Sequence, residues 1–308
     1  MSTDCKKNVA IILGYYNGIN FIEEQLNSIF QQTHKNIFTF IFNDDPNDRH
    51  IEQLINNYKE KRIKLINRKK NLGFALNFLE GLNFVNNFDY YAFSDQDDIW
   101  NKDKIEKSLK ILSKIDSKIP SLYFSRTVIV NDANNVVFGI SPNFQRGPSF
   151  ENALLQNIGG GNTMLMNKTG RDLIVKSLKS KIISHDWWTY LIISGANGYI
   201  FYDKEPSLRY RQHKKNFLGE NLSFFSKIYR IRHLLIGTYK YFLDTNLNAL
   251  NKKKSILTKK NLKLLNDLET IKKTYFPVNV FKFIVSRLHR QSFVQNIAII
   301  IGLLFKRI

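Results

Sequence analysis

Short apolar runs alternate with amphipathic segments through the first hundred residues. Continuous apolar runs, which are typical of buried strands, occupy residues 9–13, 37–42 and 63–66 and the segment that ends at Ser94. Between them, apolar side chains recur at helical spacing in residues 21–32, in 51–58 and in the segment that opens at Asn71. This β-α-β-α-β-α-β order predicts an α/β fold with a mostly parallel, Rossmann-like central sheet flanked by helices.

The pattern becomes less regular after Trp100. Strands are expected at residues 122–130 and 199–202, and helices at 105–115 and 182–193, whereas residues 164–166 form a short apolar run after a flexible turn. Farther along, the chain turns basic and amphipathic, and helices are expected at 223–236 and 271–288. We therefore divide the chain into a main domain, residues 1–220, with halves at 1–100 and 101–220, and a helical extension, residues 221–308.

Positive charge is concentrated in that extension. The chain has a formal net charge of +20, and residues 221–308 hold 17 Lys and Arg against 3 Asp and Glu. This part of the chain therefore carries a balance of +14, which leaves +6 for the other 220 residues. Such asymmetry indicates an anionic partner, either a membrane surface or nucleic acid.

The last segment, residues 293–305, is strongly apolar and has basic flanks. It is too short to cross a bilayer, because a spanning helix needs about 20 apolar residues. Its composition is typical of a helix that lies in the headgroup plane of an anionic membrane. It is equally compatible with a helix that packs on the main domain or in a homodimer interface.

The N-terminal region indicates a reducing compartment. The single cysteine, Cys5, excludes an intrachain disulfide and a site with several cysteine ligands. The apolar run at residues 9–13 is too short for the core of a signal peptide. A cytoplasmic protein is therefore expected.

Three carboxylates follow the fourth predicted strand, in Asp95-Gln96-Asp97-Asp98. Like charges this close repel each other unless a cation or strong donors compensate. Asp95 and Asp97 are two residues apart, so an extended backbone would point both toward one site. A hard cation such as Mg²⁺ or Mn²⁺ suits carboxylates at the carboxyl end of a strand. The alternative is a solvated acidic turn.

Seven short motifs occur in order between residues 8 and 219. They are VAIILGYYNG with EEQLNSIFQQT, IFNDDPND, NLGFALNF, FSDQDDIW, GGGNTMLMN, HDWW and YRQHKKNFLG. Together they resemble the motifs of family 2 glycosyltransferases of the GT-A fold, in the bacterial rhamnosyltransferase-like branch. The resemblance implies metal-dependent, inverting transfer of a sugar from a nucleotide-diphosphate sugar, either dTDP-rhamnose or a UDP-hexose. The acceptor would be a saccharide or a lipid-linked glycan in surface-polysaccharide synthesis, at the inner face of a bacterial membrane.

The resemblance also assigns the donor site to the first half of the main domain. Asp97 would bind Mn²⁺ or Mg²⁺, and Asp95 would contact the ribose or reach the metal through water. Nucleotide-sugar binding is further implied for Tyr15, Asn17, Asp44, Asp45, Asn71, Gly73 and Arg211. His213 would be a metal ligand or contact the diphosphate, and Lys214–Leu218 would form a lid. The role of Asp98 stays open.

The residues alone leave other readings open for several of these positions. Asp44 and Asp45 are common in turns, Asp48 and Asn71 are good N-cap residues, and Tyr15 could be a core tyrosine. A single histidine such as His213 is more often structural than a ligand.

The second half of the main domain would bind the acceptor. The resemblance assigns the base that deprotonates the acceptor hydroxyl to Asp186. It places Gly161 and Thr163 on the acceptor side, together with Trp187 and Trp188. Adjacent helical tryptophans cannot both face one core, so at least one is expected to face a groove. The alternative is that Asp186 caps a helix and both tryptophans belong to the core.

Two other classes of protein remain as alternatives. The charge of +20 is compatible with a nucleic-acid-binding protein, although no reader motif occurs and the acidic cluster opposes this reading. A non-catalytic nucleotide-sugar-binding protein is disfavoured, because candidates for metal ligand, base and diphosphate contact are all present. The three glycines at 159–161 lack the spacing of a dinucleotide fingerprint, and no P-loop occurs.

Overall fold

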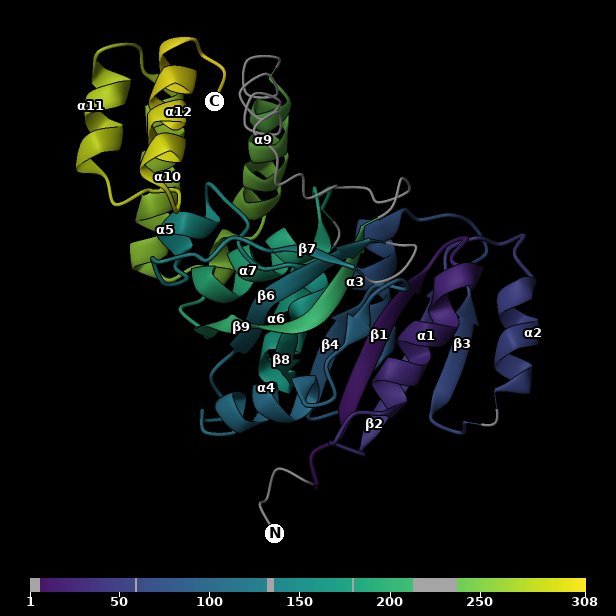
Figure 1. Ribbon diagram of the computed structural model, residues 1–308. Coiled ribbons are helices and arrows are strands. Elements are labelled where there is room, and N and C mark those ends of the chain that lie inside the picture. Colours follow the sequence, from purple (N-terminus) through teal and green to yellow (C-terminus); the bar gives the residue numbers. More distant parts are fainter. Residues whose placement is uncertain (1–5, 59, 132–135, 179, 213–236) are drawn as a thin grey trace.

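The computed structural model describes residues 6–58, 60–131, 136–178, 180–212 and 237–308 (Figure 1). The main domain holds β1 (Val9–Tyr15), α1 (Ile19–Phe30), β2 (Ile37–Asn43), α2 (His50–Asn57), β3 (Ile63–Asn67), α3 (Phe74–Phe84), β4 (Tyr90–Ser94), β5 (Ile99–Trp100), α4 (Lys104–Leu112), β6 (Ser121–Asn131), β7 (Val137–Ile140), α5 (Phe150–Ala153), the 3₁₀ turn η2 (Gly161–Thr163), β8 (Leu165–Asn167), α6 (Lys168–Lys176), α7 (His185–Gly195) and β9 (Tyr199–Gln212). The helical extension holds α9 (Thr238–Asn251), η3 (Lys254–Ile256), α10 (Lys259–Lys273), α11 (Val278–Val285) and α12 (Phe293–Leu304).

The described strands form one nine-stranded sheet in the order β3-β2-β1-β4-β8-β6-β9-β5, with β7 paired to β6. The first four strands of this order are parallel, as their alternation with helices predicts. The other half is mixed, because the short strand β8 runs antiparallel to both β4 and β6, whereas β6 and β9 are parallel. The α/β fold is confirmed, and parallel pairing dominates only its first half.

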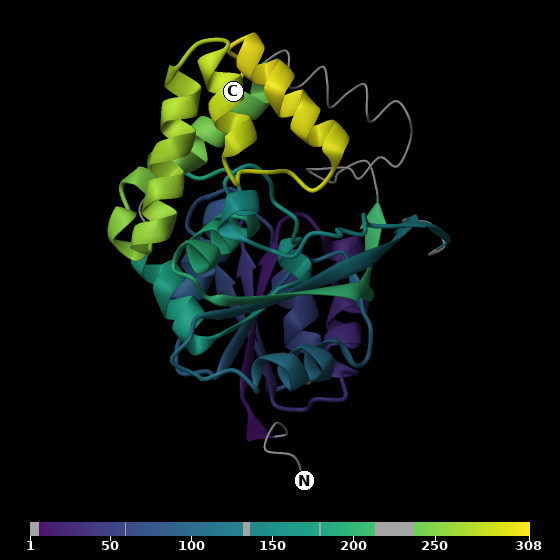
Figure 2. The ribbon, with the colours of Figure 1, turned by 90° about the vertical axis from the view of Figure 1, so that its left-hand side faces the viewer.

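Helices cover both faces of the sheet (Figures 1 and 2). Alternate residues of β1 point to opposite faces, so Ile11 packs in one core and Ile12 in the other. The core around Ile11 contains residues of α1, α2 and α4, and the core around Ile12 contains residues of α3, α6 and α7. A strand buried on both sides must be apolar throughout, which explains the continuous run in the sequence.

The carboxyl ends of the parallel strands meet at one edge. Tyr15 of β1 pairs with Asn43 of β2, and Leu13 of β1 pairs with Ser94 of β4. The turns after β1, β2 and β4 therefore begin side by side, and this edge is where open α/β sheets bind ligands.

The helical extension packs on the main domain. The hydrophobic core around Ile12 continues without a break to Leu250, Leu265 and Leu303. The Asn261 amide in α10 donates to the carbonyls of Ser194 and Gly195 at the end of α7, at 3.1 and 2.9 Å. These contacts join the extension to α7.

One helix of the extension is shorter than its sequence pattern predicts. The helix expected over residues 271–288 is wrong, because α10 ends at Lys273 and α11 begins at Val278. Pro277, which immediately precedes α11, has no amide hydrogen and cannot continue a helix from the preceding turn. The helix expected at 223–236 and the lid expected at Lys214–Leu218 lie outside the described residues, as does the boundary at residue 220. Across the described part of the chain, no helix has the length and apolarity that a membrane span requires.

Candidate active site

The turn after β4 brings carboxylates together at the carboxyl edge of the sheet. Asp95 and Asp97 are partly buried. Burial, together with the charges of Asp97 and Asp186, raises the pKa of Asp95 to about 8. The structure thus places Asp186, from the first turn of α7, within electrostatic reach of a turn that lies 91 residues earlier.

Gln96 fixes this turn against the loop after β1. Its side-chain oxygen accepts from the Tyr16 amide at 2.8 Å, and its side-chain nitrogen donates to the Tyr16 carbonyl at 3.0 Å. Gly18 leaves room for this side chain, because a Cβ there would lie 2.2 Å from Gln96 and displace it. Asn17 is exposed and has a φ of 50°, in the left-handed region that asparagine tolerates. Gln96 therefore joins the two loops through two hydrogen bonds.

Asp98, whose role the sequence leaves open, is a buried structural anchor. One of its oxygens accepts from the Asn162 amide at 2.7 Å, whereas no partner for the other occurs among the described residues. Burial raises the pKa of Asp98 well above its usual range, as do the charges of Asp95 and Asp97. Asp98 thereby ties the carboxylate turn to η2, on the predicted acceptor side.

A buried lysine lies behind this turn. The Lys104 ammonium lies 3.7 Å from the centroid of the Trp100 ring, and the residue is 1% exposed. Burial lowers the pKa of Lys104 to about 7, and the charge of Asp98 opposes this shift. The sequence analysis did not single out Lys104, since lysine in the first turn of an amphipathic helix is normally exposed.

The donor set suits a metal that takes only part of its ligands from the protein. Among the described residues, no three His, Cys, Asp or Glu side chains gather closely enough to hold a metal ion. Two neighbouring carboxylates are nevertheless sufficient for Mg²⁺, which keeps water and substrate phosphate oxygens in its shell. Asp95 and Asp97, whose mutual repulsion raises the pKa of Asp95, match that requirement. His213 lies outside the described residues.

Asp44 holds the loop that opens α3. Its two oxygens accept from the amides of Leu72 and Gly73 at 2.8 and 2.9 Å. Gly73 is the N-cap and has a φ of 77°, so any other residue would be strained there. Asn71 accepts from the Gly73 amide at 2.9 Å and lies three residues before the first residue of α3, so the alternative reading of Asn71 as the N-cap is wrong. Asp44 and the Asn71–Gly73 loop, which the sequence analysis named separately, thus form one assembly.

A second network lies beside it. Tyr15 is buried, and its hydroxyl donates to Asp48 at 2.9 Å. Asp48 also accepts from the amide of His50, the first residue of α2, at 2.8 Å, although the N-cap position itself is Arg49. Asp45 accepts from the Asn47 amide at 2.9 Å and stays partly exposed, at the surface of the edge.

His185, immediately before Asp186, is enclosed by aromatic rings. Its ring stacks on Phe78 with centroids 4.1 Å apart and meets Phe93 edge-on at 4.8 Å. Neither ring nitrogen finds a hydrogen-bond partner among the described residues, and burial lowers the pKa of His185 to about 4. A Cβ on Gly161 would lie 2.2 Å from Nε2 of His185, so this ring requires a glycine in η2.

Both tryptophans after Asp186 are buried. The Trp187 indole donates to the Ala153 carbonyl and the Trp188 indole to the Ser177 hydroxyl, each at 2.8 Å. They belong to one continuous core, so the expectation that they cannot share a core is wrong. The reason is that α7 is covered nearly all round, and a helix buried on every side has no polar face.

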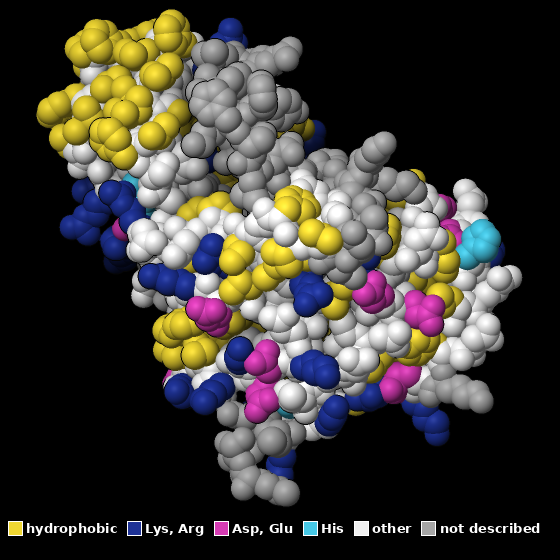
Figure 3. Space-filling model, viewed as in Figure 1, with side chains coloured by type: hydrophobic (Ala, Val, Ile, Leu, Met, Phe, Trp, Pro, Cys, Tyr) yellow, Lys and Arg dark blue, Asp and Glu magenta, His cyan; other side chains and the backbone are white. Residues whose placement is uncertain are grey.

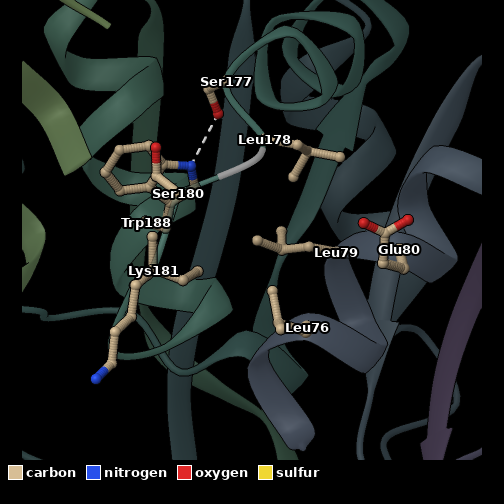
Figure 4. Close-up of a pocket in the computed structure, with 9 residues that line it drawn as sticks. Leu76, Leu79, Glu80, Ser177, Leu178, Ser180, Lys181 and Trp188 are labelled. Atoms are coloured by element: carbon tan, nitrogen blue, oxygen red, sulfur yellow. Dashed lines mark hydrogen bonds between the residues drawn. The ribbon is translucent and has the colours of Figure 1, made fainter. Parts of the chain in front are cut away.

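A hollow of about 450 Å³ adjoins Trp188 (Figure 4). It lies between α3 and the chain around residues 177–182, and its wall is mostly apolar, with Glu80 and Lys181 at the rim. Trp188 is only 1% exposed, so its ring offers little surface for stacking against a sugar. The hollow is separate from the carboxylate turn, whose residues do not line it.

Two other predicted site residues make contacts within the chain. Thr163 is buried and its hydroxyl donates to the Gly160 carbonyl at 2.7 Å, which closes η2. Arg211 of β9 is buried, donates to the Asp97 carbonyl at 3.1 Å and pairs with Glu24 of α1. Its guanidinium thus positions the carboxylate turn, and Glu24 is a contributor that the sequence analysis did not identify.

Comparison with known proteins decides the family. The model of the family described as glycosyl transferase family 2 matches residues 10–170, which include the strands and turns described above. The chain belongs to glycosyltransferase family 2. The enzyme is 32% identical over 249 residues to the dTDP-rhamnosyl transferase RfbG of Shigella flexneri, covering 76% of this chain and 83% of that protein.

Other proteins resemble this glycosyltransferase more distantly. An uncharacterised glycosyltransferase of Rickettsia typhi is 28% identical over 217 residues, covering 67% of this chain and 64% of that one. The crystal structure of S. aureus TarS 1–349 with UDP-GlcNAc has a TM-score of 0.55 at 12% identity, covering 97% of this chain and 90% of that one. This similarity confirms the GT-A type of fold.

Several contributors to the glycosyltransferase site were missed at the level of sequence. Glu24, Gln96, Asn162 and His185 stand inside motifs but carry no role in the resemblance, and Lys104 lies outside them. The partners of Glu24 and Asn162, Arg211 and Asp98, lie 187 and 64 residues away. No local pattern signals such pairs.

Proposed function

We propose that this glycosyltransferase moves a sugar from a nucleotide-diphosphate sugar to a hydroxyl group of a saccharide or lipid-linked acceptor, with inversion at the anomeric carbon. The observation that carries the proposal is the convergence of Asp95, Asp97 and Asp186 at the carboxyl edge of the sheet. These carboxylates come from two elements, and the charges of Asp97 and Asp186 oppose ionisation of Asp95, an arrangement typical of functional sites.

Each carboxylate has a distinct task in this proposal. Asp97 would bind Mn²⁺ or Mg²⁺ together with the donor diphosphate, and Asp95 would complete the site directly or through water. When bound, the cation neutralises charge on the departing diphosphate. Asp186 would accept the proton of the acceptor hydroxyl. The oxygen of that hydroxyl would at the same time bond to the anomeric carbon, as the bond between this carbon and the diphosphate oxygen breaks. The diphosphate keeps the electron pair of that bond.

The choice of donor lies between two classes. The Shigella relative is named as a dTDP-rhamnosyl transferase, and the TarS structure holds UDP-GlcNAc. The higher sequence identity favours dTDP-rhamnose for this enzyme, with a UDP-hexose as the second candidate. We further propose that the product enters a bacterial surface polysaccharide and that the enzyme works at the cytoplasmic face of the membrane.

Substitution of the carboxylates tests the chemistry. Asp97→Ala and Asp186→Asn should each lower kcat/KM for sugar transfer by at least about a hundredfold, since a metal ligand or a base is lost. Asp103→Asn, which alters an exposed carboxylate outside the site, should leave transfer near the wild-type rate. Transfer at the wild-type rate by both Asp97→Ala and Asp186→Asn would contradict the proposed mechanism.

Nucleotide binding tests the donor and the metal together. The melting temperature should rise with dTDP or UDP in the presence of Mn²⁺, because a ligand that binds only the folded state stabilises it. The same nucleotide without Mn²⁺, or with Mn²⁺ and the Asp97→Ala variant, should raise it less. An equal rise under all three conditions would exclude the metal from donor binding.

A further inference from the structure

The C-terminal helices expose a concentration of large hydrophobic side chains. Of 24 such exposed side chains among the described residues, 12 lie between residues 275 and 305. These 12, here called the apolar face, are Tyr275, Phe276, Val278, Phe281, Ile284, Val285, Phe293, Val294, Ile297, Ile301, Leu304 and Phe305. Figure 3 shows a large, nearly continuous yellow area over α11 and α12. Continuous apolar surface of this kind marks a site of interaction.

The opposite sides of the same helices are already packed. α11 buries Phe283 against the core, and α12 buries Ile299 and Leu303. Both helices therefore carry apolar side chains on the packed side and on the solvent side. A helix that is apolar all round is normally buried all round, so the apolar face calls for a second apolar medium.

The chain that carries the apolar face is basic, although Lys272 is largely buried and pairs with Asp244 of α9. Residues 270–308 contain no Asp or Glu and seven Lys and Arg, namely Lys272, Lys273, Lys282, Arg287, Arg290, Lys306 and Arg307. Dark blue side chains gather directly below the yellow area in Figure 3. A partner must therefore present an apolar surface to the centre of this area and negatively charged groups to its border.

We propose that the apolar face inserts into the headgroup region of an anionic lipid bilayer, with the surrounding Lys and Arg on lipid phosphates. Such helices bind in the plane of the membrane through apolar area and attraction to anionic lipids. α12 has 12 residues and α11 has 8, so neither would cross the bilayer.

Two other occupants match the surface less well. In a symmetric dimer the same patch faces itself, which would bring the seven basic residues of each copy toward the same charges of the other. Nucleic acid would satisfy the basic border but would leave the aromatic and aliphatic centre of the surface facing a charged backbone. A bilayer meets both requirements.

The location of the apolar face bears on the acceptor, an implication that rests on the proposed function. The helical extension lies beyond the carboxyl edge of the parallel strands, at the end of the molecule opposite the N-terminus (Figures 1 and 2). Membrane binding through α11 and α12 would bring the carboxylate turn toward the lipid surface. A lipid-linked acceptor, whose glycan projects from that surface, could then reach Asp186.

Vesicle sedimentation with the full chain tests the proposal. The wild-type protein should sediment with vesicles of phosphatidylcholine and phosphatidylglycerol, and bind vesicles of phosphatidylcholine alone more weakly. The double variant Phe281→Ser, Phe293→Ser removes two side chains that are 66% and 79% exposed. Its partition onto the anionic vesicles should fall by about a hundredfold, as expected for the loss of two inserted phenylalanines.

A matched double variant controls for general loss of exposed aromatic surface. Phe84→Ser, Phe138→Ser alters side chains that are 51% and 49% exposed and lie outside the apolar face. It should bind vesicles as the wild type does. Equal binding by the Phe281, Phe293 variant and the wild type would overturn the proposal. So would a wild-type dimer that ignores vesicles and becomes monomeric in that variant, which would assign the face to a second copy.

The same variants separate this proposal from the proposed function. Thermal shift with dTDP or UDP and Mn²⁺ does not involve the apolar face, so the Phe281, Phe293 variant should respond as the wild type does. Vesicle binding without any nucleotide response would remove the proposed function and keep the membrane surface. A nucleotide response without vesicle binding would remove the membrane surface and keep the proposed function.

Discussion

At the scale of single residues, His185 is the most unusual side chain of the site. It is 5% exposed, stacks on Phe78 and has no hydrogen-bond partner among the described residues for either ring nitrogen. A buried polar ring without partners costs stability, so a histidine here is a local conflict of the kind found at functional sites. Its position beside Asp186 and against Gly161 places that conflict at the proposed base.

This residue should make the protein less stable in mild acid. Burial lowers the pKa of folded His185 to about 4, whereas an unfolded histidine has its usual value near 6.5. Between these values the unfolded chain binds the proton and the folded chain does not, so stability falls as the pH is lowered from about 6.5 to 4. His185→Phe should remove this contribution, about 1–3 kcal/mol at the acid end.

Chemical unfolding at pH 7 and pH 4.5 measures the effect. The difference in unfolding free energy between the two pH values should be smaller for His185→Phe than for the wild type. His289→Gln, which changes a partly exposed histidine outside the proposed site, should alter that difference far less. An identical acid loss in all three proteins would show that His185 titrates as it does in the unfolded chain.

At the scale of elements, η2 depends on one glycine for close packing against α7. Gly161→Ala would place a Cβ 2.2 Å from the His185 ring, which the surrounding Phe78 and Phe93 prevent from moving away. The variant should therefore lose about 1–3 kcal/mol of stability and shift the start of α7, lowering the transfer rate. Gly147→Ala, at a position with open space, should be near neutral in both assays. Equal stability of the two variants would contradict the close packing.

Elements whose signal is local were predictable from the sequence. The strands β1 to β4 and helices α1 to α3 follow from apolar runs and helical spacing, because a doubly covered sheet requires them. β9 extends to Gln212 rather than residue 202, since its polar second half, which includes Asp203 and Lys204, has no apolar alternation to reveal pairing with β6. The apolar periodicity predicted one helix over residues 271–288, but the chain breaks this helix before Pro277.

The sequence predicted which motifs form the site, but it did not predict the contacts between their side chains. The turn at Asp95–Asp98 and the start of α7 were identified, and the structure brings Asp186 and Asp95 together. The environments of individual side chains were not predictable, because they depend on contacts across the fold. Asp44 is an example, since its oxygens are taken up by amides 28 and 29 residues farther along the chain.

At the scale of the whole molecule, the main domain and the helical extension share one hydrophobic core. Leu265 of α10 is fully buried in this core. The main domain holds all three tryptophans, which are Trp100, Trp187 and Trp188. Because the core is shared, a destabilising substitution in the extension should also lower the stability of the main domain.

Leu265→Ala should therefore lower the stability of both parts together, by about 2–5 kcal/mol. Tryptophan fluorescence, which reports on the main domain, and far-ultraviolet circular dichroism should give the same shifted transition. Leu304→Ala, at a position 43% exposed, should change either transition far less. A fluorescence transition that stays at its wild-type position would show two units that unfold independently.

The hydrogen bonds from Asn261 to the end of α7 link the C-terminal helices to the proposed base. α7 is a rod of 11 residues, about 16 Å long, with Asp186 at its first turn and the carbonyls gripped by α10 at its last. A load on the C-terminal helices would therefore act on the same helix that carries the proposed base at its other end.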